Sequence, residues 1–114
     1  MVTILELRKH LKLEKITEYY DEKKEISNGY TCDLLSWVMA KGENNMAWIT
    51  VQTHLNVVAV ACLHDFSCII IPESIEIPEN TIKKANEEGI MIFSSEKSSY
   101  EICCIMNEVG IGKK

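Results

Sequence analysis

Strand-like and helix-like segments alternate regularly from residue 46 to the end of the chain. The strand-like segments are apolar throughout and rich in β-branched residues, which is typical of strands buried on both faces of a sheet. We expect strands at 46–50, 67–71 and 90–93, and helices at 54–65, 78–89 and 98–110. Strand–helix units with short connections form a parallel sheet with right-handed crossovers. The sequence therefore predicts an α/β fold, a three-layer α/β/α arrangement with a mainly parallel sheet built from consecutive β-α units.

Two of the predicted helices carry clear end signals. The helix at 78–89 has Pro78 at its start and Gly89 at its C-terminus, the usual placement of these two residues. The last helix opens with the capping box Ser98-x-x-Glu101, in which each residue bonds the backbone of the other. These signals support the predicted boundaries.

The first 45 residues are less regular. A short amphipathic helix is expected at 3–11, with its own capping box, Thr3-x-x-Glu6. The segment 12–17 is interpreted as a strand, and the charged segment 19–28 as a loop.

A further helix of about two turns is expected after the Gly29-Tyr30 pair. Asp33 is its expected N-cap, and Gly42 marks its end. At 114 residues the chain is long enough for one domain with its own core. We therefore treat 1–114 as a single domain, with an N-terminal helix and irregular part at 1–45 and a β-α-β-α-β-α core at 46–111.

The composition excludes some classes of partner. The formal net charge of -5, with no basic stretch to offset it, argues against nonspecific binding to nucleic acid or to an anionic membrane. The longest apolar run, 57–63, is about a third of a bilayer span. No secretory signal begins the sequence, and the five cysteines form no C-x-x-C motif. Free thiols and a cytoplasmic location are expected.

The histidines and cysteines do not predict a metal site or a cofactor. His54 and His64 lie ten residues apart on one predicted helix, about 15 Å along its axis, and so do not share a metal ion. Four cysteines fall in apolar stretches and are expected to pack in the core. They are Cys62, Cys68, Cys103 and Cys104. Cys32, beside Asp33, is the one expected to be exposed.

Small polar residues follow the predicted strands, where loops lead into helix N-termini. In an open parallel sheet, ligands bind at these carboxyl ends. The candidate ligand-binding residues are Asp33, Ser36, Thr50, Gln52, Thr53, His54, Ser94 and Ser95. A rim of hydroxyls, an amide and an imidazole suits a polar or phosphorylated ligand.

Capping is the alternative interpretation for these residues. Thr53 is a plausible N-cap of the helix behind it, and the two serines at 94 and 95 are ordinary turn residues. Gln52 and His54 are not preferred caps, and this favours a ligand role for that pair.

A catalytic role has less support from the residues. His54 is a general base for Ser36 or a serine near position 95 only if the fold brings them together. The chain has no G-x-S-x-G, P-loop or G-x-G-x-x-G motif. No catalytic residue is therefore assigned.

One predicted helix is apolar on every side, from residue 57 to 63. A helix of this kind is buried all round, whereas a helix outside a sheet normally has one polar face. We predict that another protein surface covers it, most simply a second copy across a two-fold axis. The expected interface residues are Val57, Val58, Val60 and Ala61. Burial under the first 45 residues is the alternative.

Three stretches carry a resemblance to a known family. They are "SNGYTCDLLSWVMA", "AWITVQTHLNVVAVACL" and "IPENTIKKANEEGIMIFSS". Together they resemble the small DRTGG domain proteins, in which a G-Y-x-x-D-L-L-S-x-V-M block precedes a W-I-T-x-Q-x-H-x-N-x-V-A-V-A block. The likeness covers roughly residues 1–111, although the pentapeptide that names the family is absent, with "EISNG" near its expected place.

The resemblance implies a regulatory module rather than an enzyme. DRTGG domains occur fused to phosphotransacetylases and to inorganic pyrophosphatases that also carry CBS domains. They look like the N-terminal domain of HPr kinase/phosphorylase, and they act in dimer contacts and in transmitting regulatory signals.

Three functions follow for this chain. The first is a non-catalytic regulatory module that binds a small anionic metabolite, with an adenine nucleotide favoured, or regulates a metabolic enzyme in trans. In it, Thr50, Thr53 and the helix N-terminus would hold phosphate while Gln52 and His54 set orientation. The second is a ligand-free dimerisation or docking module. The third is a small hydrolase or transferase that uses His54 as general base.

Overall fold

The computed structural model describes residues 1–112. The helices are α1 (Ile4–Leu11), α2 (Leu35–Lys41), α3 (Asn56–His64), α4 (Glu79–Glu88) and α5 (Ser99–Glu108). The strands are β1 (Val2–Thr3), β2 (Glu14–Lys15), β3 (Glu25–Ile26), β4 (Asn28–Thr31), β5 (Met46–Ile49), β6 (Cys68–Ile71) and β7 (Ile92–Ser94).

Five of the strands form one sheet in the order β2-β7-β6-β5-β4. The four strands from β4 to β7 are parallel and lie side by side in chain order, and β2 joins the outer side of β7 in antiparallel direction. β1 and β3 form a separate two-stranded antiparallel sheet. The predicted α/β fold with a mainly parallel sheet is confirmed.

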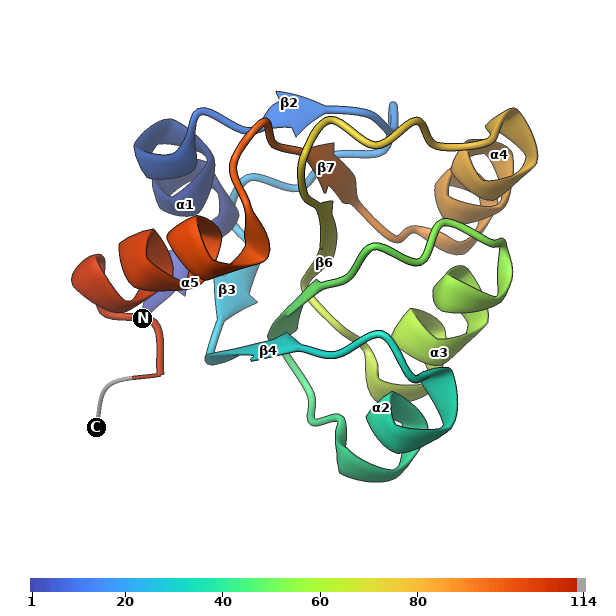
Figure 1. The fold of residues 1–114 in the computed structure, drawn as a ribbon, viewed down its shortest axis with the longest axis horizontal. Coiled ribbons are helices and arrows are strands. Elements are labelled where there is room, and N and C mark those ends of the chain that lie inside the picture. Colours follow the sequence, from blue (N-terminus) through green and yellow to red (C-terminus); the bar gives the residue numbers. More distant parts are fainter. Residues whose placement is uncertain (113–114) are drawn as a thin grey trace.

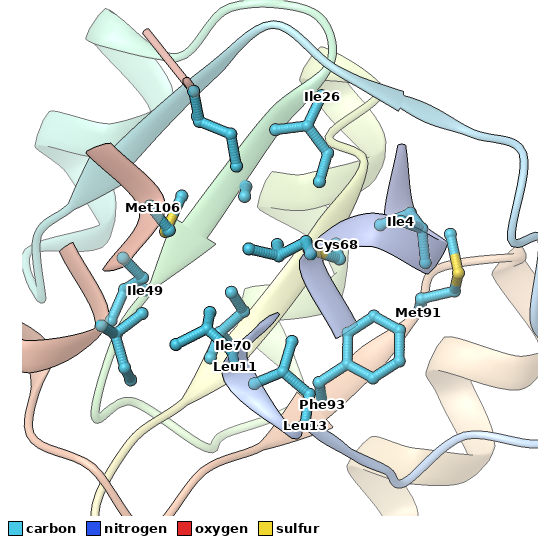
Figure 2. Packing of buried hydrophobic residues seen from close by; sticks show 14 residues of the cluster. Ile4, Leu11, Leu13, Ile26, Ile49, Cys68, Ile70, Met91, Phe93 and Met106 are labelled. Atoms are coloured by element: carbon cyan, nitrogen blue, oxygen red, sulfur yellow. The ribbon is translucent and has the colours of Figure 1, made fainter. Parts of the chain in front are cut away.

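Helices cover both faces of this sheet, which makes the three predicted layers. Figure 1 shows α1 and α5 to the left of the sheet and α2, α3 and α4 to its right. Strand residues alternate between the two sides: Cys68 and Ile70 pack under α1 and α5, whereas Ile69 and Ile71 pack under the other three helices. Figure 2 shows the first of these clusters, with Leu11 close to Ile70. The strands are apolar throughout because both faces are buried.

The predicted elements after residue 46 are present with shifts of one or two residues at their ends. Both capping boxes are present as well. The Thr3 hydroxyl accepts from the Glu6 N–H at the start of α1, and the Ser98 hydroxyl accepts from the Glu101 N–H at the start of α5. Helix boundaries that depend on local backbone bonds were therefore predicted correctly.

The first 45 residues differ more from the prediction. β4 was not predicted, because its residues Asn28–Thr31 show no hydrophobic pattern. It is the edge strand of the sheet, and its partner β5 lies more than a dozen residues later in the chain. The predicted strand at 12–17 is reduced to β2, and the predicted loop at 19–28 contains β3.

The predicted N-cap of α2 is wrong. Leu34 occupies that position, and no side chain caps the helix. The Asp33 carboxylate instead accepts hydrogen bonds from the chain that leaves β5. The end of the helix is as predicted, since Gly42 is its C-cap.

The predicted interface on α3 is wrong. Its four residues are buried inside the chain itself, with exposed fractions of 1% for Val57, 0% for Val58, 5% for Val60 and 0% for Ala61. The helix packs between α2 and α4 as well as against the sheet, so three neighbours cover it. The side that remains open carries Leu63, which is 62% exposed. The alternative was burial of this helix under the first 45 residues. It is correct in part, because α2 belongs to those residues and covers one side of α3.

The cysteines are free, and two predictions about them need correction. Cys104 is exposed, because α5 turns Ile102 and Met106 inward and Cys104 away from the core. Cys32 is half-buried rather than exposed. Cys68 is buried as predicted, and its burial raises the pKa of the thiol to about 12.

Residues 1–112 contain neither a membrane-spanning helix nor a cluster of metal-binding side chains. No helix in that range has the length and apolar character needed to cross a membrane. The same range contains no group of three or more His, Cys, Asp or Glu side chains that could hold a metal ion.

Candidate functional site

The predicted site residues divide into two groups along the carboxyl edge of the sheet. The loop after β5 brings one group together with the residues that follow β4. The loop after β7 carries the other group. β6 lies between β5 and β7 in the sheet, so the strands that lead to the two groups are two strand spacings apart, about 10 Å.

The group after β5 is organised around Thr50, which is fully buried. Its Oγ1 donates to Asp33 Oδ1 (2.8 Å) and accepts from the Gln52 N–H (3.1 Å). The Val51 N–H donates to the same Asp33 oxygen (3.0 Å), and Gln52 Nε2 donates to the Asp33 carbonyl (3.0 Å). The Thr50 hydroxyl already has a donor and an acceptor within the chain. Its predicted role as a phosphate ligand is therefore wrong, and it fixes the loop instead.

The start of α3 is also closed by internal bonds. Thr53 is not the N-cap, since Leu55 occupies that position and no side-chain cap bond is made. The Asn56 N–H donates to His54 Nδ1 (3.1 Å), and the Val57 N–H donates to the His54 carbonyl (3.0 Å). The His54 side chain thus satisfies the first N–H group of the helix, although His54 is not the N-cap residue. The helix N-terminus as a phosphate site stays a prediction, although its N–H groups at Asn56 and Val57 already have partners within the chain.

The remaining groups of this loop face outward. With Nδ1 accepting a hydrogen bond, a neutral His54 ring carries its proton on Nε2, and the residue is exposed. The Gln52 side chain is exposed, and its amide oxygen stays free to accept while its nitrogen donates to Asp33. Ser36 lies exposed in the first turn of α2. Within residues 1–112, no hydrogen bond joins His54 to a serine, threonine or cysteine side chain.

The group after β7 lines an open crevice of about 220 Å³. Ser94 and Ser95 contribute to it from the end of β7, and Ser74 contributes from the turn after β6. Lys12 and Lys97 add two positive charges to its lining.

Two acidic side chains, Glu14 and Glu96, also line this crevice. Its formal charge is therefore balanced, with lysines and glutamates in equal number. These four residues were not predicted as part of a site. Lys12 and Glu14 reach the crevice only because β2 pairs with β7, at Glu14 opposite Ser94, and that pairing has no signal in the local sequence.

The crevice lies at the point where the helices that follow the strands change from one face of the sheet to the other. The helices that follow β4, β5 and β6 all pack on one face, and the helix that follows β7 packs on the other. The chain therefore leaves the neighbouring strands β6 and β7 in opposite directions, as Figure 1 shows. Ligands of open α/β sheets bind at such a point, outside the carboxyl ends of the strands.

The turn after β6 adopts an uncommon conformation at this crevice. Glu73 and Ser74 have φ values of 57° and 53°, in the left-handed region that residues with a side chain rarely occupy. Two backbone bonds hold them there: the Glu73 N–H donates to the Lys97 carbonyl (2.9 Å), and the Ser74 N–H donates to the Ser95 carbonyl (2.8 Å). The β6 turn and the β7 loop are thus fixed to each other along one wall of the crevice.

Ser95, the residue that follows β7, is part of this wall. Ser95 is 6% exposed, and its Oγ accepts from the Lys97 N–H (3.0 Å). Ser95 is therefore a turn residue, as the alternative interpretation predicted. The hydroxyl can still donate to a ligand, because that bond uses it only as an acceptor.

Comparison with solved structures gives a match of the whole fold. The chain is similar to the CBS and DRTGG domains of the regulatory region of Clostridium perfringens pyrophosphatase, solved with its activator, diadenosine tetraphosphate. The TM-score is 0.71 at 11% sequence identity, over 92% of this chain and 46% of that chain. This chain therefore spans less than half the length of that protein's chain. The likeness shows a shared fold and agrees with the resemblance to DRTGG domains.

The two sequence comparisons gave no match. No family model matches the chain. No curated protein matches it either.

Proposed function

We propose that this chain is a non-catalytic regulatory module that binds a small anionic ligand in the crevice between the loops after β6 and β7. An adenine nucleotide is the favoured ligand. The observation that carries the proposal is the position of the crevice, at the point where the helix connections change from one face of the sheet to the other.

The charges around the crevice favour a nucleotide over a bare phosphate. Lys12 and Lys97 can each donate to phosphate oxygens. Glu14 and Glu96 would repel a bare anion, but their carboxylates accept hydrogen bonds from ribose hydroxyls or an exocyclic amino group. A ligand with both a phosphate and several hydrogen-bond donors suits this mixture.

The rim after β5 offers a second contact for the same ligand. Gln52 and His54 expose an acceptor and a donor at the same carboxyl edge of the sheet as the crevice, after a strand two places away from β7. In this proposal the phosphate lies between the lysines and the base reaches toward the rim. Support also comes from the similar regulatory region, whose activator is a dinucleotide.

A non-catalytic role agrees with the hydrogen bonding of His54, the histidine in the loop after β5. His54 Nδ1 holds the start of α3. A general base must instead be within hydrogen-bond reach of the group it deprotonates. Neither Ser36 nor Ser95 forms a hydrogen bond to it in the described part of the chain.

Isothermal titration calorimetry with AMP, ATP and diadenosine tetraphosphate tests the proposal. We expect Lys97→Ala to weaken binding about tenfold or more, because it removes a charged donor to phosphate. Lys83→Ala is the matched control, since Lys83 is exposed on α4 and does not line the crevice. Absence of binding to all three probes, or equal affinity for wild type and Lys97→Ala, would contradict the proposal.

Docking to a metabolic enzyme is the second candidate, and a surface on α2 favours it. Leu34 and Trp37, three residues apart at the start of α2, are 62% and 51% exposed there. This surface replaces α3 as the place to test a protein contact, with Trp37→Ala compared against Met39→Ala on another side of the helix. The homodimer stays a prediction, to be tested by light scattering at micromolar concentration.

A further inference from the structure

The outer edge of the sheet is open beside an apolar groove. Within residues 1–112, β4 pairs with β5 and has no strand on its other side. A groove of about 380 Å³ lies between β4 and α5, a volume in the range of ligand sites. Apolar side chains of Ile49, Met106 and Ile111 contribute to its lining, and no charged side chain among the described residues does. Figure 2 shows Ile49 and Met106 next to each other in this part of the cluster.

The backbone of β4 has bonding groups that face away from the sheet. The Cys32 N–H donates to the Ile49 carbonyl (3.3 Å), so by alternation Gly29 and Thr31 turn their N–H and C=O groups to the open side. The Gly29 N–H donates to the Asn28 side-chain oxygen (2.9 Å) rather than to β5. A side chain that covers an edge group in this way limits nonspecific strand pairing, and an incoming strand can replace it.

We propose that this edge binds an extended peptide segment of another protein. The segment adds a strand beside β4 through main-chain hydrogen bonds and places an apolar side chain in the groove. An open strand edge for affinity and a neighbouring pocket for specificity are the two parts of recognition by strand addition. This site is separate from the crevice after β6 and β7, so the inference does not depend on the proposed nucleotide site.

A second copy of the chain fits this edge less well than a foreign segment. Gly29 faces α5, since a Cβ at this position would lie 2.6 Å from the terminal methyl of Met106. Thr31 faces the same side by alternation. In an antiparallel β4–β4 pair, opposing residues lie on the same face, so each groove would meet only a glycine and a threonine. Neither is an apolar residue large enough to fill the groove, so the occupant has to bring its own apolar side chain.

The lining also selects against charge. A charged side chain placed in the groove would lose water without gaining an ion-pair partner among residues 1–112, because none of the lining residues in that range is charged. The polar groups present are neutral, from Asn28, Thr31 and Asn107. The expected segment is therefore neutral, extended and apolar at the residue that enters the groove.

Fluorescence polarisation with a panel of labelled peptides tests this inference. The probes are capped peptides of the type acetyl-Thr-Val-Thr-X-Thr-Val-amide, with Leu, Phe, Asp or Lys at X. We expect the Leu or Phe peptide to bind and the Asp and Lys peptides to bind at least tenfold more weakly. Failure of every peptide to bind at millimolar concentration would overturn the inference.

Two pairs of variants locate the binding. Asn107→Trp fills the groove from an exposed position on α5, and Glu108→Trp places the same side chain one residue away, outside the lining. Thr31→Pro removes an outward N–H that β5 does not use, whereas Thr31→Val keeps it. We expect Asn107→Trp and Thr31→Pro to lose at least tenfold in affinity, Glu108→Trp to bind as wild type, and Thr31→Val to bind at least tenfold more tightly than Thr31→Pro.

Two other results would overturn the inference. One is peptide binding that both members of each pair leave unchanged. The other is a wild-type dimer that Asn107→Trp or Thr31→Pro converts to a monomer, since this would make a second copy the occupant. Circular dichroism of each variant confirms that the fold is retained before binding is compared.

Discussion

The loops after β5 and β7 leave the same edge of the sheet and carry similar polar residues, but they use them differently. After β5, Thr50, Asp33 and Gln52 bond to one another, and His54 bonds to the start of α3. After β7, the serines line an open crevice into which two lysines also project. The first loop is held by its polar groups, whereas the second leaves its lysines and part of its serines at the crevice, where we propose that a ligand binds.

This difference shows that a polar residue at the carboxyl edge is not by itself a ligand residue. A buried hydroxyl with both of its hydrogen-bonding roles filled contributes to stability. A half-exposed lysine beside a crevice, such as Lys97, contributes little to stability and remains available for binding. Substitutions in the two loops should therefore change different properties of the protein.

The largest effect on stability is expected for Thr50→Val. The substitution removes the acceptor of the Gln52 N–H and the donor to Asp33 while it keeps the shape of the side chain. We expect the free energy of unfolding to fall by about 2 kcal/mol. Urea denaturation measures it, and Thr31→Val, at an exposed position, should stay within about 0.5 kcal/mol of wild type. Equal stability of the two variants would show that the hydroxyl bonds do not hold the loop.

A smaller effect is expected for Ser98→Ala, where the loop after β7 enters α5. Ser98 accepts from the Glu101 N–H (3.2 Å), and loss of an N-cap side chain costs about 1 kcal/mol. Ser36→Ala is the control, because Ser36 is exposed and α2 has no side-chain cap. Thermal denaturation of the two variants compares them, and a Ser98→Ala protein as stable as wild type would argue against the capping box.

The same capping box predicts a dependence on pH. Hydrogen bonds from the Ser98 backbone N–H and then its hydroxyl lower the pKa of Glu101 below its usual value of 4.5. A carboxyl whose pKa is lower in the folded state contributes stability that is fully present above its unfolded pKa and is lost as the pH falls through the folded pKa. We expect the difference in stability between wild type and Glu101→Gln to be constant above about pH 4.5 and to shrink below it. A difference that grows in acid would contradict this assignment.

The smallest effect on stability is expected for Lys97→Ala. Its side chain lies at the crevice and makes no ion pair within residues 1–112. We expect a change within about 0.5 kcal/mol in urea denaturation, although nucleotide binding is weakened. A loss as large as that of Thr50→Val would mean that the lysine supports the fold, and the contrast between the two loops would fail.

The fold could be predicted from the sequence because its main signals are local. Apolar β-branched runs and capping boxes such as Ser98 with Glu101 depend on residues close together in the chain. β4 was missed because an edge strand has an exposed side and its pairing with β5 is distant in sequence. Its existence depends on tertiary context more than on propensity.

The site was predicted only in its outline. The carboxyl edge follows from the fold, and Ser94 and Ser95 do lie at the crevice. Sequence alone could not show that the Thr50 hydroxyl is satisfied inside the chain, because both of its partners are set by the loop conformation. Nor could it place Lys12 there, since β2 and β7 are far apart in the chain.

An NMR titration of the labelled protein with AMP and diadenosine tetraphosphate tests the central claim most directly. We predict saturable shifts of the backbone amides at 12–14, 73–74 and 94–97, with smaller shifts at 52–54. We expect no more than small changes at β4, which lies at the far edge of the sheet from this crevice. Shifts confined to the start of α3, or no shifts with either nucleotide, would contradict the assignment of the crevice as the ligand site.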